Sequence, residues 1–161
     1  MVKPVCAISG IHGCIGSHLQ SYYTDQGYEV VGIPYLWMRD AHTLASYLNE
    51  LSPEIILHCA TYGNMYTQTD DGEMFASNVL APWNLLTVSK TLSLKASVLF
   101  GSSSEYGTKQ GAMKESDCPE TETLYGATKV AQTYFSRAFA KKYTLPVCVV
   151  RPFTVIGRGD R

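Results

Sequence analysis

The sequence predicts a doubly wound α/β domain built on a parallel β-sheet. Short apolar runs alternate with longer amphipathic stretches through residues 1–161, which is typical of a parallel sheet with helices on both faces. A chain of 161 residues can bury one substantial core, so we expect a single domain. Glycine-rich and polar motifs follow several of the apolar runs, at the sheet edge where such folds bind ligands.

The first half of the chain is expected to alternate strand and helix. Residues 5–8 form an apolar strand that enters a glycine turn, and residues 17–23 continue as a helix that ends near Gly27, a natural helix terminator. Residues 28–33 are rich in β-branched side chains and form the second strand. The other expected elements are a helix over 40–51 capped by Asp40, a strand over 54–58, a helix over 75–90, a strand over 97–100, a helix over 124–142 and a strand over 146–150.

Composition argues against several classes of partner. The net charge is −1 and the pI is near 6.4, without the clustered basic excess that nucleic acids or anionic membranes attract. No apolar run approaches the roughly 20 residues of a membrane span, and no signal-peptide pattern opens the chain, so we expect a cytoplasmic protein. Cys6, Cys59 and Cys148 fall in apolar runs and are expected to be core thiols, with no metal site.

A glycine motif connects the first strand to the first helix. It reads Gly10-Ile11-His12-Gly13-Cys14-Ile15-Gly16, a variant of the usual dinucleotide-binding spacing. The glycines allow a tight turn, a close approach of the backbone to phosphate and close packing of the helix on the strand. The helix N-terminus then presents free N–H groups to a pyrophosphate, so Gly10, Gly13, Cys14, Ile15 and Gly16 are candidate cofactor-binding residues.

The end of the second strand lacks the usual signal for NAD. An acidic residue that binds the adenosine ribose is expected two positions after Gly32, where Pro34 stands. Arg39 could instead reach a 2′-phosphate, which favours NADP, or it could be a surface residue before the Asp40 cap. Arg39 and Asp40 are the candidate residues for this end of the cofactor, and both NAD and NADP stay open.

Ser102, Tyr125 and Lys129 form a candidate proton-transfer site. Tyr125 and Lys129 are four residues apart and share one face of the predicted helix, where the lysine can favour the phenolate form of the tyrosine. Ser102 follows a strand and supplies a hydroxyl for a substrate oxygen. A separate stripe of that helix, expected to face the core, contains Ala127, Ala131, Phe135 and Ala138.

Pro82 interrupts the hydrogen-bonding of the predicted helix over 75–90. Proline has no N–H to donate to the carbonyl four residues earlier, which belongs to Asn78. We therefore expect a local kink that frees the Asn78 carbonyl to hold a water in a proton relay, which makes Asn78 a further candidate residue.

Together these motifs resemble the extended short-chain dehydrogenases/reductases of the NAD-dependent epimerase/dehydratase group, which act on nucleotide sugars. The resemblance implies a Rossmann-like NAD(P)-binding domain, catalytic roles for Ser102, Tyr125 and Lys129, and a cofactor lined also by Ala60 and Pro152. It is carried by the glycine motif and by residues 56–61, 78–80, 84–86, 102–107, 125–129 and 151–157.

Within that group the chain is similar to 4-ketosugar reductases of the CDP-abequose-synthase type, on the basis of residues 58–63 and 101–107. Dehydratases of the group carry an acid pair where Ser103 and Ser104 stand here, so a dehydratase is disfavoured. Glu105 could supply the acid only if the loop were shifted by one residue. Epimerase and reductase stay open.

The resemblance also implies a C-terminal region that closes over the sugar nucleotide, and we expect that substrate domain to be absent from residues 1–161. The predicted partners are therefore a nucleotide sugar, if a substrate domain is supplied, and a possible second copy of the chain. Two alternatives stay open: a non-catalytic dinucleotide-binding module, and an α/β domain that binds no cofactor.

Overall fold

The computed structural model describes residues 2–157 and contains a five-stranded parallel sheet in the order β2-β1-β3-β4-β5. The strands are β1 Val5–Ser9, β2 Glu29–Ile33, β3 Ile55–His58, β4 Ala96–Phe100 and β5 Val147–Val150. The chain proceeds from β1 to one neighbour and later returns to the other, so the strand order reverses between β1 and β3. Ligands bind near such a reversal in doubly wound sheets. The predicted fold class is confirmed.

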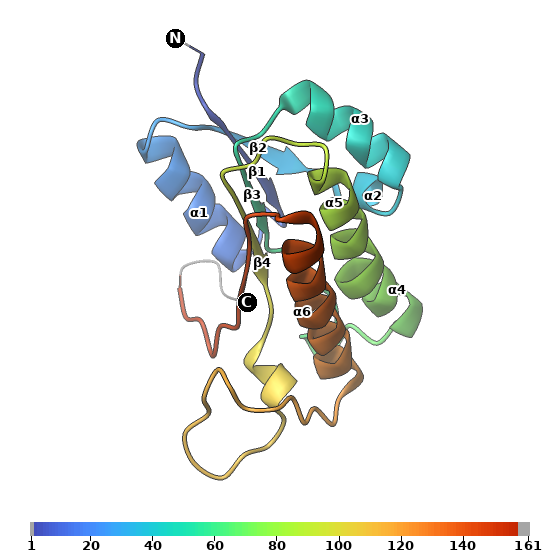
Figure 1. Ribbon diagram of the computed structural model, residues 1–161. Helices are drawn as coiled ribbons and strands as arrows, with labels where there is room; N and C mark the ends of the chain where they lie inside the picture. The colour runs from blue at the N-terminus through green and yellow to red at the C-terminus, as the bar shows by residue number, and fades with distance from the viewer. Residues whose placement is uncertain (1, 158–161) are drawn as a thin grey trace.

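Helices cover the two faces of this sheet unequally (Figure 1). The helices are α1 Cys14–Asp25, α2 Tyr35–Met38, α3 Ala41–Leu51, α4 Asp71–Phe75, α5 Ala81–Ser89 and α6 Leu124–Tyr143, with a π-helical turn η1 at Ala76–Leu80 and a 3-10 turn η2 at Ser103–Tyr106. Helix α1 packs on one face, whereas α3, α5 and α6 lie on the other. Right-handed crossovers produce this division, because the return from β2 to β3 passes over the opposite face from α1.

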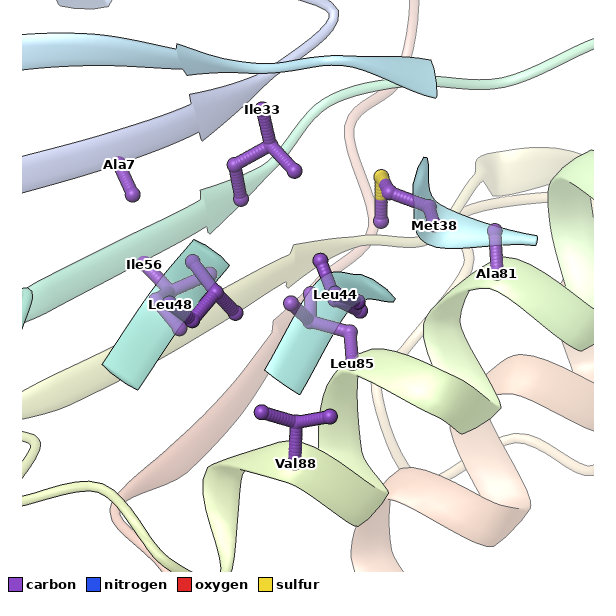
Figure 2. Packing of buried hydrophobic residues seen from close by; sticks show 9 residues of the cluster. All are labelled: Ala7, Ile33, Met38, Leu44, Leu48, Ile56, Ala81, Leu85 and Val88. Carbon is purple, nitrogen blue, oxygen red and sulfur yellow. The ribbon is translucent and has the colours of Figure 1, made fainter. Parts of the chain in front are cut away.

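The main core lies between the sheet and helices α3 and α5. Figure 2 shows Leu44 and Leu48 of α3 and Leu85 of α5 beside Ile56 of the sheet, and all four are fully buried. Burial of each such side chain contributes roughly 1.5–3 kcal/mol. A second cluster under α1 contains Cys6, Ile8, Ile55 and Leu57, so alternate residues of β1 and β3 face opposite sides of the sheet.

Cys148 does not belong to the core. Cys6 is buried as expected, Cys59 is half-buried, and Cys148 is exposed on β5. The expectation failed because β5 is an edge strand whose α1-side face is not covered by any helix of the described residues 2–157. An apolar run therefore identified the strand correctly but not the burial of both its faces.

The helix expected over 75–90 begins earlier and is not uniform. Asp70 caps α4 by accepting a hydrogen bond from the Glu73 amide at 2.9 Å, so the helix starts at Asp71. The π-turn η1 directly precedes α5, and Pro82 is the second residue of α5. The kink and the free Asn78 carbonyl that Pro82 would produce stay a prediction.

The expected core stripe of α6 is confirmed only at Phe135, which packs with the buried Phe139 against the core. Ala127 and Ala138 are exposed, and Ala131 is half-buried. The buried face of the helix is otherwise polar and consists of Thr128, Lys129, Gln132, Thr133 and Ser136. A polar face can be buried here because part of it bonds to fixed groups of the sheet edge and of η1, as described below.

Candidate active site at the carboxyl edge of the sheet

The glycine turn has the geometry of a phosphate cradle. Gly10 has a φ of 68°, and a Cβ there would lie 2.7 Å from the backbone nitrogen of Ala60. A Cβ on Gly16 would overlap the carbonyl of Gly10. Both positions therefore need glycine, one for its backbone conformation and the other for the packing of α1 on the turn. Gly13 donates its N–H to the Gly10 carbonyl at 3.0 Å and closes the turn.

The N-terminus of α1 carries a positive potential, and the first turn of the helix contains no acidic side chain that would offset it. The N-cap, Gly13, provides no side-chain cap. The N–H groups and the helix dipole therefore favour an anion at this end. Cys14 and Ile15, the first residues of the helix, line a cleft with a volume of about 610 Å³.

This cleft brings together segments that are far apart in the sequence. Its walls come from the start of α1, the loop after β3, the loop after β4, the start of α6 and the segment after β5. Among the predicted site residues, the lining includes Cys14, Ile15, Ser102, Tyr125, Lys129 and Pro152. The three candidate catalytic side chains thus share one cavity with the helix end that favours an anion.

Ser102 is held by a short capping motif. Its Oγ accepts a hydrogen bond from the Ser104 amide at 3.1 Å, and its own amide donates to Glu105 Oε1 at 3.0 Å. Because an oxygen lone pair of the hydroxyl serves the cap, its hydrogen can still be donated to another group. The next amide, of Ser103, donates to the Pro152 carbonyl at 3.0 Å and attaches the loop to the segment after β5.

Glu105 is a structural carboxylate. It is fully buried, and its Oε2 lies 2.9 Å from Arg151 Nε in an ion pair that lacks hydrogen-bond alignment. The same guanidinium donates to the Tyr106 hydroxyl at 2.8 Å from Nη1. The alternative in which Glu105 acts as a catalytic acid would require the capping motif and the ion pair to break.

Tyr125 is placed by the start of α6. Thr123 caps the helix by accepting from the Gly126 amide at 3.0 Å. A Cβ on Gly126 would lie 2.7 Å from the Ser104 carbonyl, so only glycine lets the helix begin this close to the loop that contains Ser102. Tyr125, one residue earlier, is half-buried and faces the cleft.

Lys129 is a buried cation at the base of the cleft. It is 1% exposed, and its Nζ donates to Gln132 Oε1 at 2.9 Å, while Gln132 Nε2 donates to the Phe100 carbonyl at 3.2 Å. Burial lowers the pKa of Lys129 to about 8, and the charges of Glu105 and Cys59 oppose that shift. The ammonium therefore predominates at pH 7, although it titrates closer to neutrality than an exposed lysine.

Asn78 supports the cleft without lining it. Its side chain is fully buried, accepts from the Tyr62 amide at 3.0 Å and from the Thr61 hydroxyl at 3.1 Å, and is bonded through Nδ2 to the Tyr62 carbonyl at 2.7 Å and Thr128 Oγ1 at 3.0 Å. These bonds fasten the loop after β3 to α6. The amide has no capacity left for a cofactor, so a direct role of Asn78 rests on its backbone carbonyl alone.

Arg39 and Asp40 already have partners outside the cleft. Asp40 Oδ1 caps α3 by accepting from the Thr43 amide at 2.7 Å, and this bond lowers the pKa of the carboxyl. Arg39 Nη1 lies 3.1 Å from Glu73 Oε2. Asp40 is therefore a helix cap in this structure, and cofactor binding by either residue stays a prediction.

His58 forms a buried pair with Ser9 at the ends of β3 and β1. The hydroxyl of Ser9 and Nδ1 of the imidazole are 2.7 Å apart, and the imidazole is fully buried. Burial, together with the charge of Lys129, lowers the pKa of His58 to about 3. The ring is therefore neutral at pH 7. Ser9 Oγ also accepts from the Ala60 amide at 3.3 Å, which fixes Ala60 beside Gly10.

Sequence reasoning missed the supporting residues more than the candidate catalytic ones. Gln132 and Ser9 lie outside the motifs used above, and His58 and Arg151 lie within motif segments but were given no role of their own. Glu105 could have been found as a cap, because a serine followed three residues later by glutamate is a known N-terminal signature.

Residues 2–157 contain neither a cluster of metal-ligating side chains nor a helix suited to span a membrane. No group of three or more His, Cys, Asp or Glu side chains in this part of the chain is arranged to hold a metal ion. None of its helices combines the length and apolarity that crossing a membrane requires.

Comparison with known proteins gives a consistent picture. The model of a family described as the NAD dependent epimerase/dehydratase family matches residues 6–161. A probable UDP-glucuronate 4-epimerase of Rhizobium meliloti (strain 1021) is 27% identical, in an alignment covering 96% of this chain and 54% of that protein. The chain spans about half the length of the curated relatives it matches.

Solved structures agree with this match. A UDP-glucuronic acid 4-epimerase from Bacillus cereus, in complex with NAD, superposes with a TM-score of 0.82 at 25% identity, covering 98% of this chain and 59% of that one. MoeE5, in complex with UDP-glucose and NAD, also has a TM-score of 0.82, with 29% identity and coverage of 97% and 56%.

Proposed function

The chain belongs to the NAD dependent epimerase/dehydratase family, and from this premise we propose that it is the cofactor-binding and catalytic part of a nucleotide-sugar epimerase or 4-ketosugar reductase. One observation carries the proposal: Ser102, Tyr125 and Lys129 line the same cleft as the start of α1. The relatives that are 4-epimerases, and the solved structures in complex with NAD, support the epimerase reading and NAD as the cofactor.

The residues of the cleft fit a nicotinamide dinucleotide. Gly10 and Gly16 let the turn pack backbone against backbone, so the start of α1 adjoins the end of β1, and the first turn of α1 contains no acidic residue to oppose a pyrophosphate. Gly13, Cys14 and Ile15 would hold the phosphates, while Lys129 and Pro152 would lie toward the nicotinamide ribose. The bound dinucleotide supplies the acceptor and donor of hydride.

In this proposal, Tyr125 accepts and returns the proton that accompanies hydride transfer. When a sugar alcohol is oxidised, Tyr125 in its phenolate form takes the hydroxyl proton as the carbon loses hydride. In the reverse step the phenol returns a proton to the carbonyl oxygen. Ser102 donates a hydrogen bond to that oxygen, and the Lys129 ammonium lines the same cleft as a positive charge.

Tyr125→Phe tests the catalytic assignment. With NAD and UDP-glucose or UDP-glucuronic acid, the unaltered chain should exchange hydride or epimerise the sugar, and the variant should lose about 10²–10⁴-fold in rate because the proton has no acceptor. The affinity of the variant for NADH should stay within about twofold of that of the unaltered chain, since the aromatic ring at position 125 is retained. Turnover that survives Tyr125→Phe would refute the assignment.

A second candidate is a dinucleotide-binding module without turnover of its own. It needs only the glycine turn and the start of α1, and it assigns no role to Tyr125. NADH binding without sugar-dependent turnover would identify it. We also propose a cytoplasmic location. We further propose that the chain self-associates, and light scattering of the purified chain tests this.

A further inference from the structure

We infer that Glu73 determines which nicotinamide cofactor the chain selects, by holding Arg39 in an ion pair beside the carboxyl end of β2. The inference rests on the proposed dinucleotide site and names the residue that makes this site prefer NAD, the proposed cofactor, over NADP. It reverses the simplest reading of the sequence, in which an arginine after the second strand, without an acidic residue at the strand end, favours NADP.

The Glu73 carboxylate is engaged on both oxygens. Oε2 lies 3.1 Å from Arg39 Nη1, and Oε1 accepts a hydrogen bond from the hydroxyl of Tyr35. The Arg39 guanidinium also lies over the ring of Tyr35, 5.8 Å from its centroid. Burial and the bond to Glu73 raise the pKa of Tyr35 to about 12, so its hydroxyl stays a donor at neutral pH. Tyr35 of α2, Arg39 directly after this helix and Glu73 of α4 thus form one cluster of interacting side chains.

This cluster lies where the adenosine ribose is expected. Helix α2 begins directly after β2, with Pro34 as its N-cap. At the end of β2, a Cβ on Gly32 would lie 3.1 Å from Ile11 Cγ2, so the strand end and the glycine turn are in contact. A dinucleotide whose pyrophosphate occupies the turn extends its adenosine across the end of the second strand.

Charge then decides between the two cofactors. The 2′-phosphate that distinguishes NADP is an anion, and an unpaired Arg39 would bind it in a charge-assisted hydrogen bond. Here the guanidinium is already paired, and the phosphate would approach the Glu73 carboxylate. The acidic group that Pro34 replaces at the end of β2 is thus supplied from α4. The side chains of Arg39 and Glu73 are 41% and 27% exposed, so the pair can respond to a bound ligand.

Titration of the purified chain with NADH and with NADPH tests the inference, with nicotinamide fluorescence as the readout. The unaltered chain should prefer NADH. Glu73→Gln removes the negative charge but keeps the shape, and it should raise the affinity for NADPH about tenfold relative to NADH. The double variant Arg39→Ala/Glu73→Gln should lose that gain. Asp71→Asn is the matched control, because it removes a charge from the same helix.

An unchanged affinity ratio in folded Glu73→Gln, or an equal shift in Asp71→Asn, would overturn the inference while leaving the dinucleotide site intact. A preference of the unaltered chain for NADPH would also overturn it. Failure of the unaltered chain to bind either cofactor would instead refute the proposed function, and this inference with it.

Discussion

At the scale of single residues, the cleft depends on polar side chains that are buried and paired. Ser102 is held through Glu105, which is in turn held by Arg151. Lys129 is held by Gln132. A buried polar group without a partner costs about 1–3 kcal/mol, so these pairs keep the candidate catalytic groups in place as well as stabilise the fold.

The candidate catalytic residues were predictable because their identity and spacing reflect chemistry. A tyrosine and a lysine four apart on a helix, after a serine at a strand end, already predict a proton-transfer site. Their partners were not predictable in the same way. Gln132 bonds to the Phe100 carbonyl across 32 positions of sequence, and only the folded chain brings the two together.

His58 should make the stability of the chain sensitive to acid. An unfolded histidine binds a proton below about pH 6.5, whereas the folded pKa is about 3. Between these values the unfolded state binds more protons, so the free energy of unfolding should fall with decreasing pH by up to about 1.4 kcal/mol per unit from this group. In His58→Gln, urea unfolding from pH 7 to pH 4 should show a correspondingly flatter dependence.

His12→Gln is the control for that measurement, because His12 is exposed and its replacement removes one imidazole without touching the buried pair of Ser9 and His58. A pH dependence in His58→Gln as steep as in the unaltered chain would contradict the assignment of a buried neutral imidazole.

At the scale of elements, the sequence predicted strands better than helix faces. Each strand is a short apolar run. Such runs are typical of strands in parallel sheets that helices cover, so they predict a strand more reliably than another element. The buried face of helix α6 was predicted only in part, because most of the buried residues of this helix are polar. Thr128 faces Asn78 and Gln132 faces the end of β4, so tertiary hydrogen bonds outweigh the amphipathic pattern.

Gly126→Ala tests how closely α6 must approach the Ser102 loop. Because the new Cβ would meet the Ser104 carbonyl, we expect a loss of about 1–3 kcal/mol in the free energy of unfolding, measured by urea denaturation. Gly72→Ala is the matched control, since Gly72 lies within α4 and its Cβ would approach only the Asp70 carboxylate, at 3.3 Å. Equal stability of the two variants would show that the helix start can move away from the loop.

At the scale of the whole molecule, the sequence predicted a parallel doubly wound sheet but not the order of its strands. Order follows from how the crossovers pack, and no local motif encodes it. The cleft emerges only from that order: β1 and β3 are neighbours, so the glycine turn after one lies beside Ala60 after the other.

The central claim is that the glycine turn and the start of α1 bind a nicotinamide dinucleotide. Its most direct test is calorimetric titration of the chain with NADH, beside Gly16→Ala, whose Cβ would overlap the Gly10 carbonyl. We predict saturable binding with one site per chain, and affinity at least about tenfold weaker in the variant, a difference of about 1.4 kcal/mol. Absence of saturable binding to the folded, unaltered chain, or equal binding to both proteins, would contradict the claim.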